Sequence, residues 1–321
     1  MWRNFFSTRH PHQRAIRYAT LSFVVTRLHG GLGNQFFQYA AGRALALRYG
    51  AALKLDIGIF VEYTLRRYEL DKYPIQATIA TEEELSAFAH EPQKGRVGRL
   101  IDTISGRSRP TRYREPKCFD PALFGLSVPI HLTGYWQSER YFQHISETIR
   151  RELTPVAPLD ADNERALTDI LRSSSIAVHV RRGDYLKSAV HGTLPVGYYR
   201  RAMDYMASRV SKPVFYVFSD EPSWVHENLH HPAPLVQMNI NGPERGFRDI
   251  QLMSACQYHI LANSSFSWWG AWMNTSSEKI VIAPKPWYLR KQIETPDLFP
   301  EGWVAIPTYD LYDNREREGG A

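Results

Sequence analysis

Three stretches of the sequence carry residue types that bind anions at points where a strand is expected to end. The first, residues 29–35 (HGGLGNQ), contains three glycines and leads into an apolar helix. Glycine permits positive φ and close approach of a ligand, and a helix N-terminus offers free N–H groups to a phosphate. Gly31, Gly33 and Asn34 are therefore candidate phosphate contacts. A dinucleotide fingerprint would need a third glycine where Phe36 stands, and a plain structural turn stays open.

The second stretch, residues 179–184 (HVRRGD), follows a strand with alternating apolar residues. Period-two alternation puts His179 and Arg181 on the opposite face, where the chain leaves the sheet. The guanidiniums of Arg181 and Arg182 match phosphate oxygens, so we expect a diphosphate contact here. The alternative is an ion pair of Arg182 with Asp184 beside one exposed arginine.

The third stretch, residues 249–269, contains a helix, a short strand and then the polar segment 263–267. Ser264 or Ser265 is suited to cap the helix that follows, and hydroxyls and backbone N–H groups then converge above the strand end. Capping alone is the alternative, although it does not exclude anion binding. The two tryptophans that end the stretch are expected to pack in the core.

Other carboxylates are ambiguous. Asp220 ends a strand, where a ligand contact and an ordinary helix cap are equally favoured. Asp160 and Asp162 imitate a metal-binding pair, but they follow two prolines and open a helix, so capping is expected. No cluster of His and carboxylates has the spacing of a zinc or magnesium site, and no metal is expected.

The composition is that of a globular protein of about two domains. The 321 residues are 43% hydrophobic and 22% charged, which fits disorder, collagen and coiled coil poorly. Cys118 and Cys256 stand apart without a C-x-x-C pattern, which argues against a disulfide framework. No apolar run approaches the ~18 residues of a membrane span, and no secretory signal is recognisable, so we expect a cytoplasmic protein.

Positive charge is concentrated at the start of the chain. The net charge is +6, and the first 55 residues hold seven Arg and one Lys without a carboxylate. We interpret residues 1–22 as a basic extension that is either solvated or in peripheral contact with the anionic inner membrane face. No nucleic-acid-binding module is recognisable, so no nucleic-acid partner is expected.

Strand and helix patterns alternate in both halves, which predicts two α/β domains with parallel sheets and ligands at the carboxyl ends of the strands. We place the domains at 23–155 and 156–321, divided in the proline-containing segment 154–162. The stretch 62–116 is the least regular and is expected to carry substrate-facing loops. The expected strands are 22–28, 53–55, 130–135, 176–181, 214–219, 235–238, 258–262 and 280–283, and the expected helices are 34–49, 81–90, 139–152, 163–172, 197–209, 222–229, 248–256 and 266–273.

The three stretches, in this order, resemble the α-1,2-fucosyltransferases of glycosyltransferase family 11. The glycine loop running into FFQYA at 36–40, HVRRGD at 179–184 and the segment 249–269 carry the resemblance, which covers about residues 24–307. It implies a GT-B fold, in which two Rossmann-like domains face each other across a cleft. It also implies GDP-β-L-fucose as donor, a galactose-terminated glycan as acceptor, inversion to an α-linked fucoside, and no metal requirement.

The resemblance also implies residue roles. Arg181 would hold the β-phosphate, Asp249 would bind the guanine edge with help from His179, and the hydroxyls of Ser264 and Ser265 would hold phosphate. The glycine loop of the first domain, which is the acceptor side, would close on the donor. The predicted donor site comprises Gly31, Gly33, Asn34, His179, Arg181, Arg182, Asp220, Asp249, Asn263, Ser264, Ser265 and Phe266.

Inversion requires a base near the acceptor hydroxyl, and the resemblance does not supply one, since Ala189 stands where some relatives have a carboxylate. Asp184 is the first candidate, with His191 and His29 as alternatives. Two other functions stay open at this point. One is a nicotinamide or flavin oxidoreductase built on the first βαβ unit, and the other is a sugar-nucleotide or glycan-binding protein without turnover.

Overall fold

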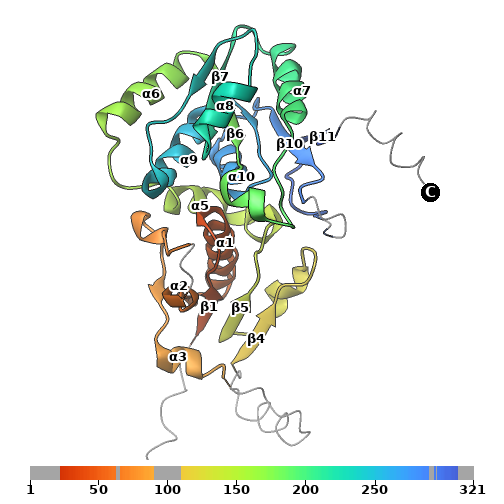
Figure 1. Cartoon of the computed structure of the whole chain (residues 1–321). Helices are drawn as coiled ribbons and strands as arrows, with labels where there is room; N and C mark the ends of the chain where they lie inside the picture. The colour runs from red at the N-terminus through yellow and green to blue at the C-terminus, as the bar shows by residue number, and fades with distance from the viewer. Residues whose placement is uncertain (1–21, 63–65, 90–109, 289–292, 294, 310–321) are drawn as a thin grey trace, which may run out of the picture.

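The structure is a computed structural model that describes residues 22–62, 66–89, 110–288, 293 and 295–309. Figure 1 shows two α/β halves, one above the other, with helix α1 rising from the first half toward the second. Residues 1–21, which make up nearly all of the predicted basic extension, lie outside the described residues. The membrane contact of this extension and the cytoplasmic location of the protein therefore stay predictions.

The first sheet is parallel throughout and has the order β3-β2-β1-β5-β4. Its central strand β1 (Phe23–Arg27) is apolar and buried, and helix α1 (Leu32–Tyr49) crosses over to β2 (Ala52–Asp56). This confirms the predicted βαβ unit, with Gly50 closing the helix in the left-handed conformation at φ 58°. The remaining strands are β3 (Thr78–Ile79), β4 (Thr111–Arg114) and β5 (Ile130–Thr133).

The second sheet is also parallel, with the order β11-β10-β9-β6-β7-β8. Helices cover both faces of this sheet, as expected for a doubly wound fold. Its strands are β6 (Ser174–Val180), β7 (Pro213–Ser219), β8 (Leu235–Gln237), β9 (Tyr258–Ile260), β10 (Val281–Lys285) and β11 (Val304–Pro307). Its helices are α6 (Ala161–Leu171), α7 (Val196–Ala207), α8 (Pro222–Asn228), α9 (Gly246–Ala255) and α10 (Ser265–Met273).

Two parallel sheets with alternating helices confirm the predicted GT-B type of architecture. The first sheet takes its strands from residues 23–133 and the second from residues 174–307. The predicted division at 155/156 falls between these ranges, and the domain boundary itself stays a prediction.

Several elements differ from the expectation. Strands β3, β4 and β11 and the short helix α2 (Ile59–Glu62) are absent from the predicted set, because these segments are short or rich in charge and lack an apolar period. The predicted helix 139–152 begins as two 3-10 turns, Glu139–Tyr141 and Gln143–Ile145, before α5 (Ser146–Glu152). The 3-10 turns Leu70–Lys72, Pro121–Gly125, Gly183–Lys187 and Pro243–Arg245 complete the short elements.

Side chains cap the first turns of α3 and α6. Thr81 and Glu84 form a capping box at the start of α3 (Glu82–Ser86). Asp160 is the N-cap of α6 and accepts a hydrogen bond from the Asn163 amide, so its carboxylate has the structural task that the proline-flanked sequence predicted. Residues 90–109, which include the predicted end of the α3 helix, lie outside the described part.

Aromatic side chains of α1 and α10 join the two halves. Phe37 lies 4.4 Å from Trp268 and 4.9 Å from Trp269, and Phe36 lies 5.3 Å from Trp269, between ring centroids. All four side chains are fully buried, and aromatic pairs of this kind add about 0.5–1.5 kcal/mol each beyond burial. The prediction that the tryptophans are core is therefore confirmed, and the halves share one hydrophobic core.

Parallel pairing brings the carboxyl ends of neighbouring strands to one edge of each sheet. Val180 at the end of β6 pairs with Ser219 of β7, so Arg181 and Asp220 emerge side by side. Likewise, β4 pairs with β5 up to Arg114 and Thr133, so the residues that follow these two strands also emerge together. The chemistry-bearing loops of both halves thus lie at such edges.

Candidate active site

Helices α1 and α10 meet at their N-termini. A Cβ at Gly33 would lie 2.5 Å from the Ser265 carbonyl carbon and 2.7 Å from the Phe266 nitrogen, so only glycine allows this approach. Neither helix has an acidic residue in its first turn. Because each N-terminus carries about half a positive charge, the junction is suited to an anion.

Arg181 lies at the end of β6, held by two carboxylates. Its Nη2 donates to Asp184 Oδ1 at 2.7 Å, and its Nε lies 3.2 Å from Asp220 Oδ2. Arg182 instead donates to Glu221 at 2.9 Å and stacks over the Trp224 ring at 4.2 Å. The alternative interpretation, an ion pair of Arg182 with Asp184, is therefore wrong, because the two arginines point to different carboxylates.

Asp220 does not cap α8. Its Oδ1 accepts the backbone N–H of Arg182 at 2.9 Å, while the N-cap position belongs to Glu221, whose side chain makes no capping bond. The capping interpretation of Asp220 is wrong, and the carboxylate instead fixes the turn that presents Arg181. Asp220 also fills the space beside Gly183, where a Cβ would lie 2.6 Å from its Oδ2.

A third guanidinium, which the sequence did not single out, comes from the first half. Arg66 forms an ion pair with Asp184 Oδ2, and its Nε lies 3.7 Å from the position of a Cβ on Gly31. Arg66 therefore bridges the glycine loop and the Arg181 edge. The next residue, Arg67, forms a second ion pair across the halves with Glu244. Arg66 belongs to the stretch 62–116 that was expected to face the substrate.

The polar segment after β9 is confirmed as a helix cap. Ser264 accepts the Phe266 backbone N–H at 3.3 Å, and its hydroxyl also bonds to Tyr185, whose ring lies 5.5 Å from the Arg181 guanidinium. Asn263 donates to the carbonyl oxygens of His191 and Gly192, while its buried Oδ1 has no partner among the described residues. The arginine edge and the α10 N-terminus are thus one continuous surface.

At the other end of this surface, His179 and Phe266 lie next to the start of α9, the helix that carries Asp249. The His179 ring lies 5.4 Å from the Phe266 ring, and that ring touches the position of a Cβ on Gly246 at 3.4 Å. Burial, and then the charge of Arg181, lowers the pKa of His179 to about 3, so the ring is neutral. Its Nδ1 is buried and has no partner among the described residues.

Asp249 is held by a chain of amides. Its Oδ1 accepts from Asn241 Nδ2 at 2.9 Å, and Asn241 exchanges hydrogen bonds with Asn163, which is anchored on the α6 cap Asp160. Arg245 forms an ion pair with the same Asp160. Burial raises the pKa of Asp249 to about 7, although the Asn241 bond opposes the shift. Strongly perturbed pKa values cluster at functional sites, which makes Asp249 a candidate functional group.

The three candidate bases lie in different settings. Both Asp184 oxygens accept from guanidiniums, Oδ1 from Arg181 and Oδ2 from Arg66. His191 stacks on Tyr185 at 4.6 Å and lies edge-on to Tyr288 at 5.3 Å, and burial lowers its pKa. The assignment of Asp184 or His191 as base stays a prediction.

His29 is fixed by Gln38. The Gln38 Oε1 accepts the His29 backbone N–H at 2.9 Å, which places its Nε2 3.0 Å from the ring Nδ1. Burial and the charge of Arg27 lower the pKa of His29, so the ring is neutral. The amide nitrogen of Gln38 also lies 3.2 Å from the carbonyl oxygens of His29 and Gly134, and a hydrogen bond with the Arg27 backbone opposes the pKa shift. His29 is therefore held in place by the protein's own groups at the edge of the glycine loop.

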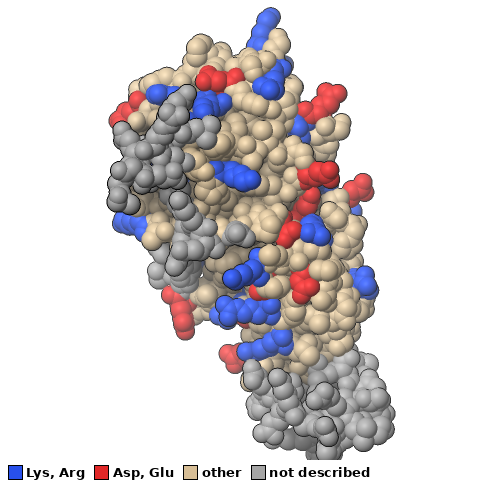
Figure 2. Space-filling model, turned by 90° about the vertical axis from the view of Figure 1, so that its right-hand side faces the viewer, with Lys and Arg blue, Asp and Glu red and all other residues tan. Residues whose placement is uncertain are grey.

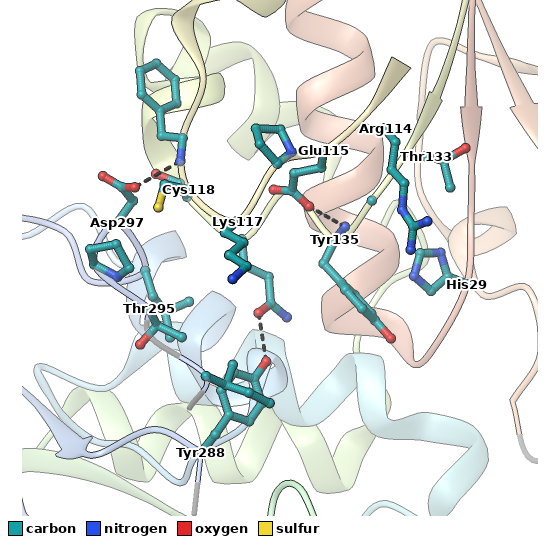
Figure 3. Close-up of a pocket in the computed structure, with 18 residues that line it drawn as sticks. His29, Arg114, Glu115, Lys117, Cys118, Thr133, Tyr135, Tyr288, Thr295 and Asp297 are labelled. Carbon is teal, nitrogen blue, oxygen red and sulfur yellow. Dashed lines mark hydrogen bonds between the residues drawn. The ribbon is translucent and has the colours of Figure 1, made fainter. Parts of the chain in front are cut away.

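A cavity of about 350 Å³ opens beside His29, between the two halves. This is within the ~300–1,000 Å³ of small-molecule sites. Figure 3 shows Glu115 and Tyr135 from the first half and Tyr288 from the second pointing toward the same space. Tyr288 donates to Gln137 Oε1 at 3.2 Å, and Gln137 donates to Asn34 at 2.9 Å.

Charged groups also line this cavity. Arg114, Lys117 and Asp297 contribute to its wall, with Asp297 accepting from the Phe119 backbone N–H. Figure 2 shows Lys and Arg side chains gathered on one face near the junction of the two halves. Among the residues that the structure describes, no three His, Cys, Asp or Glu side chains are grouped so as to hold a metal ion. No helix in that part of the chain is long and apolar enough to cross a bilayer.

Two parallel α/β halves, with cations and helix N-termini at one edge of the cleft and a polar pocket beside it, define a glycosyltransferase of the GT-B type. The model of Glycosyl transferase family 11 matches residues 111–307. The chain belongs to this family, which confirms the predicted resemblance and leaves the oxidoreductase interpretation without support.

Similar proteins agree on the family. The chain is 36% identical over 299 residues to an alpha-1,2-colitosyltransferase of Escherichia coli, covering 89% of this chain and 99% of that protein. It is 30% identical over 284 residues to the O-antigen biosynthesis glycosyltransferase WbnK of the same organism, covering 81% and 93%. The human galactoside alpha-(1,2)-fucosyltransferase 1 is 30% identical over 156 residues, which is 45% of this chain and 43% of that protein.

Solved structures are similar at low TM-scores. The NodZ alpha-1,6-fucosyltransferase soaked with GDP-fucose has a TM-score of 0.44 at 15% identity, covering 79% of this chain and 93% of that chain. A point mutant of the Arabidopsis thaliana FUT1 in complex with GDP has a TM-score of 0.48 at 12% identity, covering 92% of this chain and 78% of that chain.

Proposed function

We propose that this protein is a galactoside α-1,2-fucosyltransferase. It transfers L-fucose from GDP-β-L-fucose to O2 of a terminal galactose, inverts the anomeric centre, and needs no metal ion. The names of its relatives support the linkage and the sugar class. The donor binds to the second half, residues 156–321, and the acceptor to the first, residues 23–155.

The observation that carries this proposal is the junction of α1 and α10 beside Arg181. Two helix N-termini and two guanidiniums, those of Arg181 and Arg66, surround one place between the halves. A diphosphate is the anion that best matches this much positive charge and this many N–H donors. Gly31, Gly33 and Asn34 then contact it from the first half, and Ser264 and Ser265 from the second.

The chemistry follows from that charge. When the bond between fucose C1 and the β-phosphate oxygen breaks, its electron pair stays on the phosphate. Arg181 and the α10 N-terminus lie where this developing charge needs stabilisation, and such preorganised groups cost no reorganisation in the transition state. Asp184 and Asp220 hold the guanidinium in place before the donor arrives.

The guanine ring fits the surface formed by His179, Phe266 and Asp249. The Asp249 carboxylate accepts from the N1–H and exocyclic amine of the base, while the neutral His179 and the Phe266 ring line the slot. Asn241 supports Asp249 from behind with its 2.9 Å hydrogen bond. Adenine and uracil lack this donor pair, so the slot is selective for guanine.

The acceptor sugar fits the 350 Å³ cavity beside the glycine loop. Tyr135, which is 49% exposed, and Tyr288 offer aromatic faces to a sugar ring with hydroxyl groups at hand. His29 lines the same cavity. A galactose ring in this pocket is bounded on the donor side by Tyr288 and Gln137.

The test is transfer by the purified chain from GDP-fucose to a panel of galactose-terminated and other glycans, with mass spectrometry and NMR of the product. We expect a fucose residue with an α-anomeric signal at galactose O2. If the purified chain binds GDP-fucose but neither hydrolyses nor transfers it, the result would favour the alternative of a binding protein without turnover.

The donor sugar is tested in the same assay. Colitose differs from fucose by lacking the hydroxyl at C3, and the relative with 36% identity is named for colitose. We expect GDP-fucose to be the better donor. A preference for GDP-colitose would change the donor sugar and leave the guanine and phosphate assignments intact, since these do not involve C3.

A further inference from the structure

Glu115 is the carboxylate at the centre of the acceptor cavity. It directly follows β4, and the turn that follows the neighbouring strand β5 wraps around it. Figure 3 shows its carboxylate between Lys117 and Tyr135, over the middle of the pocket. This is the carboxyl edge of the first sheet, where ligands bind in α/β folds.

The turn after β5 is shaped to hold this side chain. Glu115 Oε2 accepts the backbone N–H groups of Tyr135 and Trp136, both at 2.7 Å. A Cβ at Gly134 would lie 2.3 Å from the Glu115 Cβ, so glycine is required there. Trp136 adopts φ 58°, a left-handed conformation that costs a bulky residue about 1–3 kcal/mol. The strained Trp136 backbone is the one whose N–H holds an oxygen of the Glu115 carboxylate.

The second oxygen has no such partner. No hydrogen bond or ion pair among the described residues involves Glu115 Oε1, and Glu115 lines the cavity. Burial raises the pKa of this carboxyl above its usual range, although the two backbone donors oppose the shift. A carboxylate made more basic by its surroundings is better suited to take a proton near neutral pH.

Glu115 is also connected to the donor side. Tyr135, whose N–H it accepts, lies 4.4 Å from His29 of the glycine loop, between ring centroids. From the other half, the Tyr288 ring lies 5.3 Å from the His191 ring, between centroids. Burial raises the pKa of Tyr288, and the nearby Tyr185 and Glu115 raise it further. Through Tyr288, His191 and Tyr185 in succession, Glu115 is thus linked to the Arg181 edge.

We propose that Glu115 is the general base of the transfer reaction. Its Oε1 takes the proton from the acceptor hydroxyl as that oxygen forms the bond to fucose C1. The bond from C1 to the β-phosphate oxygen breaks, and its electron pair leaves with GDP. No electrons are exchanged with another reagent, and the Glu115 proton later passes to water. The assignment rests on the proposed glycosyl transfer.

The other candidates are less suited to this step. Asp184 would have to give up its bonds to Arg181 and Arg66 to accept a proton, because each of its oxygens already accepts from one of these guanidiniums. The His29 ring is already engaged by Gln38 and the Arg27 backbone. Glu115 is the carboxylate that combines one anchored oxygen with one available oxygen in the pocket.

The first experiment is Glu115→Gln, in which the amide oxygen can still accept both backbone N–H groups. We expect kcat to fall by about 10²- to 10⁴-fold, with GDP binding by calorimetry and the melting temperature unchanged. The matched control is Glu227→Gln on the exposed face of α8, which should match the wild type. Unchanged kcat in Glu115→Gln would overturn the assignment and leave Glu115 as a turn-forming residue.

The pH profile separates a base from a structural residue. In the wild type, kcat/KM for the acceptor, measured with GDP-fucose saturating so that the titration of Asp249 does not contribute, should fall on the acidic side as Glu115 becomes protonated, with the limb displaced upward from that of an ordinary glutamate. Glu115→Asp, which keeps the charge but withdraws it by one methylene, should be slow yet retain this limb, whereas Glu115→Gln should lack it. Equal losses in both variants together with a lowered melting temperature would show that activity follows the turn, and the proposal would be wrong. A wild type without any transfer would contradict the proposed function instead.

Discussion

The charged groups at the two edges of the cleft are held in different ways. At the donor edge, Arg181 is held by Asp184 and Asp220, and Arg182 by Glu221, so the guanidiniums are already oriented. At the acceptor edge, Glu115 is anchored through backbone N–H groups, and one oxygen is left available.

The difference matches the two tasks of a transferase. A leaving diphosphate brings its own charge, so the protein must supply fixed cations and hold them apart until they are needed. An acceptor hydroxyl is neutral, and the protein must supply a group that changes its protonation state. Ion pairs at the acceptor edge would oppose that change, whereas they assist the donor edge.

The largest expected effect comes from removing the Arg181 guanidinium from the donor edge. Arg181→Ala should lower kcat by at least about 10²-fold, because single charge-stabilising donors contribute this much and because Asp220 would lose its guanidinium partner and Asp184 would keep only Arg66. The fold should survive, since the side chain leaves the sheet at its edge. Steady-state kinetics and thermal denaturation measure both.

Arg182→Ala provides the comparison within the same motif. Its guanidinium lies over Trp224 and bonds to Glu221, so we expect a smaller loss than for Arg181→Ala. Equal losses would contradict the distinct roles of the two arginines, and near-normal turnover of a folded Arg181→Ala would remove Arg181 from the mechanism.

The next largest effect concerns Asp249, at the proposed guanine end of the donor edge. Asp249→Ala should weaken GDP binding roughly 10- to 100-fold, because a hydrogen bond to a charged group contributes about 1.5–3 kcal/mol. Acceptor affinity should not change, since the proposed acceptor site lies across the cleft. Calorimetry with GDP, ADP and UDP on the wild type and the variant measures this.

The exposed Asp162, which pairs with Arg165 on α6, is the matched control, and Asp162→Ala should bind GDP normally. Two results would count against the guanine assignment. One is wild-type protein that binds ADP or UDP as tightly as GDP, and the other is an Asp249→Ala variant that keeps its preference for GDP.

A smaller effect follows from the pKa of Asp249, which burial raises to about 7. The carboxylate form accepts from guanine, so below this pH the free protein must lose a proton to bind. GDP affinity should therefore fall by up to about tenfold per pH unit below 7 and level off above it. Calorimetry in two buffers of different ionisation enthalpy should show proton release in the acidic range. In Asp249→Asn the dependence should vanish, and affinity independent of pH in the wild type would contradict the assignment.

The donor edge was largely predictable from sequence, and the acceptor edge was not. Arg181, Asp220 and Ser264 each directly follow an apolar strand within a few residues, so local pattern and parallel pairing bring them together. Glu115 follows the short charged strand β4, TRYR, whose alternation of half-buried and exposed residues gives no apolar signal.

Partners distant in the chain determine the rest. The role of Glu115 depends on Gly134 and Trp136, and the position of Arg66 depends on Asp184, more than 100 residues away. A sequence states which residue types are present, but contacts of this span require the register of two sheets and the docking of two halves. Strand-end position was the one signal that could have marked Glu115 in advance.

The smallest expected effect concerns metal ions. Chelation with EDTA should leave initial transfer rates nearly unchanged, because Arg181, Arg66 and the N-termini of α1 and α10 supply the charge that Mg²⁺ supplies in other transferases. Added divalent ions could still raise steady-state rates by binding the product GDP in solution, so single-turnover rates are the measurement to compare.

Complete loss of transfer on chelation, restored only by Mn²⁺ or Mg²⁺, would contradict this. The metal could not then bind at Asp160 without dismantling the α6 cap and the ion pair with Arg245. The nearest carboxylates to the diphosphate would be Asp184 and Asp220, which share the Arg181 guanidinium. A metal there would displace Arg181 from both, so metal dependence and the proposed role of Arg181 exclude each other, and one chelation experiment tests both.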